Sequence, residues 1–120
     1  MRSLEHGDIE DIRVWRNEQM DVLRQSQPLT AQEQELWWRT VYQMEATAEP
    51  PRQLLFVMRE SERRMAYGGF TNIEWNVRRA EISFLAATAT AAAPDEYEPT
   101  QRRFLEFLID FGFGPLRLAR

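Results

Sequence analysis

Residues 65–87 read MAYGGFTNIEWNVRRAEISFLAA, and this stretch decides the fold that the sequence predicts. Two runs rich in aromatic and branched side chains, residues 65–75 and 78–85, are separated only by Asn76 and Val77. Runs of this composition around a tight turn predict an antiparallel hairpin. In the first run, Gly68 and Gly69 indicate a bulge or the close approach of another backbone, and so a place where a ligand can lie.

The second run alternates between apolar and polar side chains, which is the period of a strand with one face on a core. One face carries Ala80, Ile82 and Phe84, and the other carries Arg79, Glu81 and Ser83. Glu81 is therefore expected as a carboxylate on the less apolar face of a central strand.

The composition excludes several classes of function. At 120 residues and 43% apolar, the chain suffices for one domain with a core. All fifteen basic residues are arginine and the net charge is −4, which argues against a lysine nucleophile and against nucleic-acid binding. The absence of cysteine and the single His6 argue against disulfides and metal sites. Without an apolar run of about 18 residues no membrane partner is expected, and the chain is predicted to be cytoplasmic.

Two helices are expected before the hairpin. Residues 2–5 form a possible first strand, and Asp8 is expected to cap a helix over residues 9–18 that continues loosely toward residue 24. Thr30 and Glu33 form a capping box, which predicts a second helix to about residue 46. The apolar stripe expected on this helix is Leu36, Trp37, Val41 and Met44. Residues 54–58 (LLFVM) predict a strand, and the charged residues 59–64 a turn into the hairpin.

A third helix is expected after the hairpin. Residues 86–93 are a connection of small residues, and the helix is predicted over residues 99–111, with Pro99 in its first turn and Gly112 past its end. Residues 116–119 are expected to begin a last strand. The order of helix, helix, three antiparallel strands and helix predicts an α+β layer fold.

These segments resemble a known family. Residues 67–75 (YGGFTNIEW) and 78–84 (RRAEISF) resemble the third and fourth strands of GNAT-type N-acetyltransferases that act on ribosomal-protein N-termini or amino sugars. Residues 11–18 (DIRVWRNE) and 28–34 (PLTAQEQ) are similar to the family's first and second helices. The resemblance implies one GNAT-like domain over residues 1–120, with a mixed sheet that has antiparallel central strands, two N-terminal helices and one helix after the fourth strand.

The resemblance also implies acetyl-CoA as cosubstrate. In the family, its pantetheine arm bonds to backbone groups of the fourth strand, and its pyrophosphate lies on the amides that open the next helix. The matching backbone positions are Phe84, Leu85, Ala86 and Ala87. The family's glycine-rich phosphate loop is missing, since no glycine lies between Gly69 and Gly112. Arg102 and Arg103, expected in the first turn of that helix, either substitute in part or form a solvated face.

Glu81 is the expected general base, because an amine must lose its ammonium proton before it attacks a thioester. The alternative is an ion pair with Arg78, Arg79 or a neighbouring strand. The acceptor is expected to be a small-molecule or peptide amine, and acids such as Glu18 and Glu74 suit a cationic one. The residues expected to line its pocket are Trp15, Arg16, Asn72 and Glu74, with Trp37 or Trp38, although each tryptophan is also a candidate for the core.

Domains of this family usually continue with a further strand, with which residues 116–119 align, so the domain is expected to be incomplete at its C-terminal end. A fourth strand without this neighbour exposes amides and apolar surface, which predicts a homo-oligomer. Two hypotheses of function stay open. The first is an N-acetyltransferase, and the second is a non-catalytic GNAT-derived module that binds CoA or another protein.

Overall fold

A four-stranded antiparallel sheet forms the centre of the computed structural model, which describes residues 1–118. The strands are β1 (Arg2–Ser3), β2 (Leu54–Glu60), β3 (Arg63–Glu74) and β4 (Arg79–Ala86), and they follow one another in that order across the sheet. The predicted hairpin and the two strands expected before it are therefore confirmed. The prediction that Glu81 lies on a central strand is wrong for the described residues, because no strand in residues 1–118 pairs with the outer side of β4.

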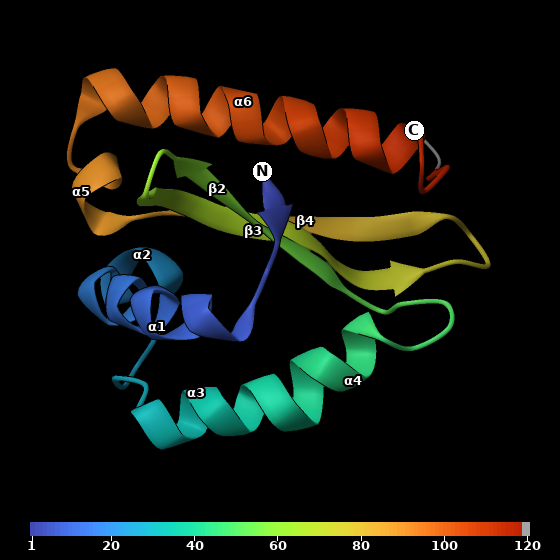
Figure 1. Ribbon diagram of the computed structural model, residues 1–120, viewed down its shortest axis with the longest axis horizontal. Helices are drawn as coiled ribbons and strands as arrows, with labels where there is room; N and C mark the ends of the chain where they lie inside the picture. Colours follow the sequence, from blue (N-terminus) through green and yellow to red (C-terminus); the bar gives the residue numbers. More distant parts are fainter. Residues whose placement is uncertain (119–120) are drawn as a thin grey trace.

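Helices cover both faces of the sheet (Figure 1). α6 (Pro94–Phe113) crosses one face, and the other is covered by α1 (Ile9–Glu18) and α3 (Ala31–Trp37). This arrangement confirms the α+β class. None of the helices in the described part of the chain combines the length and the apolar character needed to cross a bilayer.

Each face of the sheet has its own core, because successive strand side chains point to opposite faces. The α1-side core is built from Leu4, Ile9, Ile12, Trp15, Trp38, Tyr42, Leu55, Val57, Leu85 and Ala87. The α6-side core is built from Phe56, Ala66, Phe70, Ile73, Phe104 and Leu108. In β4, Ala80 and Phe84 pack on the α6-side core and Leu85 belongs to the α1-side core. The alternation of this strand is therefore confirmed, and it places Glu81 on the α1 side.

Two glycines allow the three long strands to approach one another closely. A Cβ atom on Gly68 would lie 2.2 Å from the carbonyl oxygen of Ser83, and one on Gly69 would lie 2.1 Å from that of Leu54. The close approach predicted for this pair is thus confirmed. The bulge lies further along β3, between Thr71 and Glu74, where Asn72 has a φ of 50°.

The first predicted helix is confirmed as α1, which follows the 3-10 turn η1 (His6–Asp8) and leads into α2 (Met20–Leu23). Asp8 precedes α1 as expected, but its side chain makes no capping hydrogen bond to the helix. It is instead buried beneath two arginines, as described below.

The second helix begins at the predicted capping box, in which Thr30 and Glu33 exchange two 3.0 Å hydrogen bonds. It continues through the π-helical segment η2 (Trp38–Tyr42) into α4 (Gln43–Ala46) and ends where predicted. The predicted apolar stripe is wrong, because Leu36 and Met44 are 53% and 66% exposed while Trp37 and Val41 are half-buried. The buried face is formed by Gln34, Trp38 and Tyr42. The wider π-helical turn shifts the phase of the helix, so a constant helical period misplaces the stripe.

The C-terminal helix is longer than predicted. The alanine-rich connection contains a short helix, α5 (Thr88–Ala91), and α6 starts with Pro94 at its first turn, so Pro99 lies inside it. An internal proline costs a backbone hydrogen bond, and this is why the sequence favoured the later start. Gly112 does not follow the helix but lies in it, where an added Cβ atom would be 3.2 Å from the Phe70 ring.

Residues 116–118 do not form the predicted last strand, and Ala119 lies outside the described residues. The backbone N–H groups of Leu116 and Leu118 donate to the carbonyl oxygens of Phe111 and Gly112, at 3.1 and 2.7 Å. These bonds satisfy carbonyls at the end of α6, and both leucines pack against the α6-side core. The segment therefore closes the helix.

Candidate functional site

The bulge in β3 turns Asn72 toward Glu81 on the neighbouring strand. The register pairs Thr71 with Glu81, and the Asn72 Nδ2 donates to the Glu81 Oε2 over 3.0 Å. Glu74 and Arg79 form an exposed ion pair of 3.0 Å next to them. The alternative in which Glu81 pairs with an arginine is not what the structure contains, because Arg79 is engaged by Glu74 and no ion pair of Glu81 occurs among residues 1–118.

Three residues predicted from the sequence thus meet in one place. Asn72, Glu74 and Glu81 line an open cavity of about 330 Å³, together with Arg79 and Ala80. We call it the hairpin cavity. Glu81 is the one exposed carboxylate of this cavity that has no cationic partner in the described chain. It can therefore accept a proton close to the edge of the sheet.

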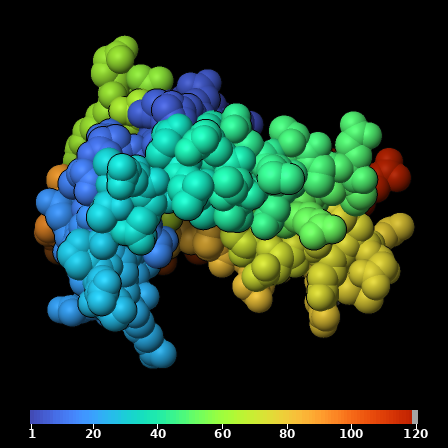
Figure 2. All heavy atoms as spheres, turned by 90° about the horizontal axis from the view of Figure 1, so that it is seen from below, coloured from blue at the N-terminus to red at the C-terminus, as the bar shows by residue number. Residues whose placement is uncertain are grey.

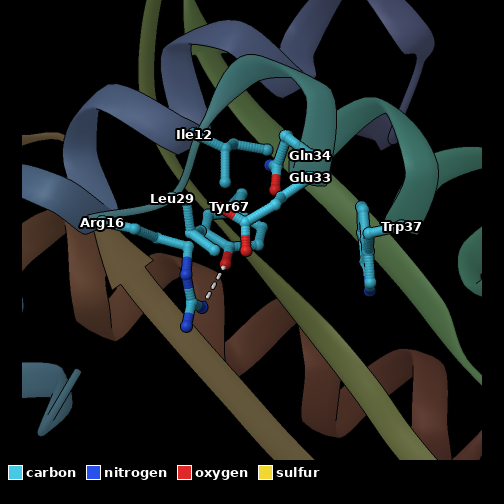
Figure 3. A pocket seen from close by; sticks show the side chains of 7 residues that line it. All are labelled: Ile12, Arg16, Leu29, Glu33, Gln34, Trp37 and Tyr67. Atoms are coloured by element: carbon cyan, nitrogen blue, oxygen red, sulfur yellow. Dashed lines mark hydrogen bonds between the residues drawn. The ribbon is translucent and has the colours of Figure 1, made fainter. Parts of the chain in front are cut away.

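A second cavity lies between α1, α3 and β3 (Figure 3). It measures about 220 Å³ and is lined by Ile12, Arg16, Leu29, Glu33, Gln34, Trp37 and Tyr67. The Arg16 Nη1 donates to the Tyr67 hydroxyl over 3.2 Å, which brings together residues far apart in the sequence. We call this the Arg16 cavity.

The structure divides the predicted acceptor residues between different environments. Arg16 and Trp37 line the Arg16 cavity, whereas Trp38 is buried in the α1-side core. Trp15 also belongs to that core, with 8% of its surface exposed. Glu18 accepts a 2.7 Å hydrogen bond from the Thr88 hydroxyl and lies at a third cavity, between α1 and α5. Among residues 1–118, Glu18 and Glu74 therefore lie at different cavities.

The Arg16 and hairpin cavities open on the same side of the sheet. Tyr67 is paired with Leu85 and Thr71 with Glu81, so Tyr67 and Glu81 lie about 13 Å apart along β4. Figure 2 shows this side hollowed between the blue segment that includes α2 and the yellow β3–β4 hairpin. Tyr67 was not identified as a site residue from the sequence, because its partner Arg16 lies on a helix that is distant in the sequence. The alternation of side chains along β3 was the one signal that could have placed Tyr67 on this face of the sheet.

At the end of β4, the side chains of the predicted cofactor residues are occupied by packing. Leu85, Ala86 and Ala87 are at most 7% exposed, and the Phe84 ring packs edge-on against Phe104 with centroids 5.3 Å apart. Part of the backbone is also engaged, since the Ala86 carbonyl accepts from Gln19 Nε2 at 2.9 Å. What these residues offer to a ligand is therefore the backbone along the unpaired outer side of β4.

Arg102 and Arg103 do not lie in the first turn of their helix. α6 begins at Pro94, and both arginines are exposed in its middle, roughly 12 Å along the axis from its start. The first turn carries Asp95 and Glu96 instead. The guanidinium that contacts this turn is that of Arg63, which donates to Glu96 at 2.8 and 3.3 Å.

A buried carboxylate ties the start of α1 to the sheet. The Asp8 side chain is fully buried and accepts hydrogen bonds from Arg2, Arg64 and the Glu5 N–H, at 2.7 to 2.8 Å. Burial acts to raise the pKa of Asp8, but the bonds from Arg2, the Glu5 N–H and Arg64 outweigh it and lower the pKa to about 2. The charged cluster joins β1 and β3 to the start of α1.

Comparisons in sequence find no relative, since no protein-family model and no curated protein matches the chain. Solved structures do match in fold. A chimera of the spermidine N-acetyltransferase SpeG from Vibrio cholerae with hSSAT has a TM-score of 0.70 at 19% identity, over 98% of this chain and 64% of that one. The dodecameric spermidine N-acetyltransferase from Vibrio cholerae in an intermediate state has a TM-score of 0.68 at 19% identity, over 98% and 63%.

A mutant form of the spermidine/spermine N-acetyltransferase SpeG matches with a TM-score of 0.67 at 21% identity, over 98% and 63%. The chain therefore spans less than two thirds of the length of these structures. At such identities the likeness concerns the fold, which is the GNAT-type fold that the resemblance of the sequence implies.

Proposed function

We propose that the protein is an acetyl-CoA-dependent N-acetyltransferase that acts on a primary amine of a small molecule, an amino sugar or a protein N-terminus. The observation that carries this proposal is the position of Glu81, an exposed carboxylate held by Asn72 on the strand whose outer edge is unpaired in residues 1–118. In amine acetylation a proton acceptor can deprotonate the amine, and unpaired backbone groups can bond to the amide-bearing arm of the cosubstrate.

The residues fit one part of acetyl-CoA better than the other. The backbone at Phe84, Leu85, Ala86 and Ala87 suits the amide-bearing pantetheine arm, because an unpaired strand edge presents both donors and acceptors. The start of α6 suits the pyrophosphate less well, since Asp95 and Glu96 repel it and Glu96 already engages Arg63. We therefore expect the arm to contribute most of the binding free energy.

When bound, acetyl-CoA supplies the acetyl thioester. Glu81 accepts the proton that the acceptor ammonium must lose, either directly or through a water molecule. Asn72 fixes the orientation of the Glu81 carboxylate by its 3.0 Å hydrogen bond, so that the second carboxylate oxygen remains available. Phe84 and Leu85 hold the backbone of β4 in place, because their side chains are packed into the cores on either side of the sheet.

A second candidate function is a non-catalytic module that binds CoA weakly or binds another protein. The observation that favours it is the acidic first turn of α6 together with the exposed, mid-helix positions of Arg102 and Arg103. This candidate predicts no acetyl transfer to any amine.

The two candidates are separated by an assay of CoA thiol release with a panel of amines. Polyamines come first in the panel because the matching structures are described as spermidine N-acetyltransferases, followed by amino sugars and peptides with free N-termini. For the best acceptor, Glu81→Gln is expected to lower kcat by roughly a hundredfold or more. Glu106→Gln is the control, since it neutralises an exposed carboxylate on α6 outside the hairpin cavity and is expected to leave kcat unchanged. An unchanged rate in Glu81→Gln would remove Glu81 as the base.

We also propose that the protein works in the cytoplasm as a homo-oligomer. Support for assembly comes from the exposed apolar side chains of Ile82 and Ile109, at 51% and 47% exposure, which lie at one cavity between β4 and α6. One of the matching structures is described as dodecameric. Light scattering at several protein concentrations tests this proposal, and a constant monomer mass would contradict it.

A further inference from the structure

The Arg16 guanidinium is a half-buried cation without an acidic partner. Its hydrogen bond goes to the neutral hydroxyl of Tyr67, and no carboxylate in residues 1–118 lies within ion-pair distance of it. The neighbouring Arg13 on the same helix is instead bound by Glu10. A partly desolvated guanidinium is stabilised by an anion that accepts its hydrogen bonds, and this partner is missing from the described chain.

The other residues that line the Arg16 cavity indicate which kind of molecule would carry this anion. Four of its seven lining side chains, Ile12, Leu29, Trp37 and Tyr67, supply apolar or aromatic surface. Gln34 donates to the Ile9 carbonyl at 3.2 Å, and Glu33 is exposed and accepts from the Thr30 N–H, so neither neutralises Arg16. At about 220 Å³ the cavity is smaller than the roughly 300–1,000 Å³ of drug-sized sites. It suits a small apolar or aromatic group with one negative charge.

We propose that the Arg16 cavity binds the carboxylate end of the acceptor, so that the acceptor is an amine that also carries a carboxylate and an apolar or aromatic body. This identification as acceptor rests on the proposed function. The cavity opens on the same side of the sheet as Glu81, about 13 Å along β4. When Arg16 binds the carboxylate, the amine must therefore lie at the other end of an extended acceptor that spans about this distance to reach Glu81.

Calorimetry with two probes of similar shape and opposite charge tests the binding step without acetyl-CoA. The expected result is saturable binding of 3-phenylpropanoate and no detectable binding of 2-phenylethylamine. Arg16→Gln is expected to weaken the binding of 3-phenylpropanoate by roughly tenfold to a hundredfold, because a hydrogen-bonded charge pair is lost. Arg16→Lys, which keeps the charge, is expected to lose less.

Two control variants show whether the effect belongs to the charge of Arg16. Arg24→Gln removes an exposed arginine outside the cavity, and Glu33→Gln neutralises the carboxylate within it while preserving its capping role. Both are expected to bind 3-phenylpropanoate at least as tightly as the parent chain. Thermal unfolding of each variant verifies that the fold is retained.

The inference is overturned by equal or tighter binding of 2-phenylethylamine, by unchanged affinity in a folded Arg16→Gln variant, or by no binding of 3-phenylpropanoate to the parent chain. Because neither probe titration includes acetyl-CoA, failure of the proposed function has a different signature. A chain that binds 3-phenylpropanoate through Arg16 but does not bind acetyl-CoA keeps this cavity as an anion site and contradicts the acetyltransferase proposal.

Discussion

The amide of Asn72 reaches across the β3–β4 hairpin to the carboxylate of Glu81, with 3.0 Å between Nδ2 and Oε2. The contact depends on the bulge in β3, where Asn72 has a φ of 50°, a conformation that asparagine and glycine tolerate better than other residues. The positive φ of Asn72 and its side-chain amide therefore both contribute to the orientation of Glu81, the proposed base.

Replacement of Asn72 separates these two roles. Asn72→Gly removes the amide but tolerates the positive φ, so kcat for acetyl transfer is expected to fall roughly tenfold with little change in KM or stability. Asn72→Ala is expected to show the same loss of kcat and a further destabilisation of about 1 kcal/mol from the strained backbone. Steady-state kinetics and urea unfolding measure the two effects. Wild-type kcat in Asn72→Gly would show that this hydrogen bond has no part in the reaction.

The buried Asp8 cluster predicts an acid-sensitive fold. The pKa of Asp8 is lowered in the folded chain to about 2 from an ordinary value of 3.8, so the unfolded chain binds a proton more readily. The resulting stabilisation, about 2 kcal/mol, is fully present above about pH 5 and is lost progressively as the pH falls from about 5 to about 1. Urea unfolding of the parent chain and of Asp8→Asn across this range measures it.

At neutral pH, Asp8→Asn is expected to destabilise the fold by about 3 kcal/mol, because Arg2 and Arg64 lose their shared carboxylate. Asp11→Asn is the control: Asp11 is 48% exposed and pairs with Arg64 at 3.0 Å, so its loss is expected to cost less than about 1 kcal/mol. The account of this cluster fails if Asp8→Asn retains the full pH dependence of the parent chain.

Because Gly68 contacts the backbone of β4, replacement by alanine is expected to affect the stability of the chain very differently at Gly68 and at Gly7. Gly68→Ala is expected to destabilise the chain by about 2 kcal/mol or more, since the new methyl group would lie 2.2 Å from the Ser83 carbonyl oxygen. Gly7→Ala is the matched control, with nothing within 4 Å of the added atom, and it is expected to be neutral or slightly stabilising. Thermal unfolding of both variants checks this, and equal stabilities would be inconsistent with the strand register.

The hairpin and its site residues were predictable because their determinants are local. Glu81, Asn72 and Glu74 lie on two strands joined by a short turn, so alternation and turn chemistry suffice to bring them together. The Thr30–Glu33 capping box is local in the same way.

The features that were missed depend on tertiary packing or on conflicting local signals. The contact between Arg16 and Tyr67 spans a helix and a strand. The stripe on the second helix changes phase at the π-helical segment, and Trp38 and Tyr42 replace Leu36 and Met44 as its buried side chains. The start of α6 was obscured by two prolines, and its position moves Arg102 and Arg103 away from the helix terminus. The expectation that those arginines lie in the first turn of the helix is wrong for that reason.

The proposed function depends on the binding of acetyl-CoA along β4. Calorimetric titration of acetyl-CoA into the purified chain at modest salt measures this binding. Saturable binding with a micromolar dissociation constant, about −8 kcal/mol, is expected. No detectable heat, together with no shift of the unfolding temperature at high acetyl-CoA concentration, would contradict it and favour the module that binds another protein.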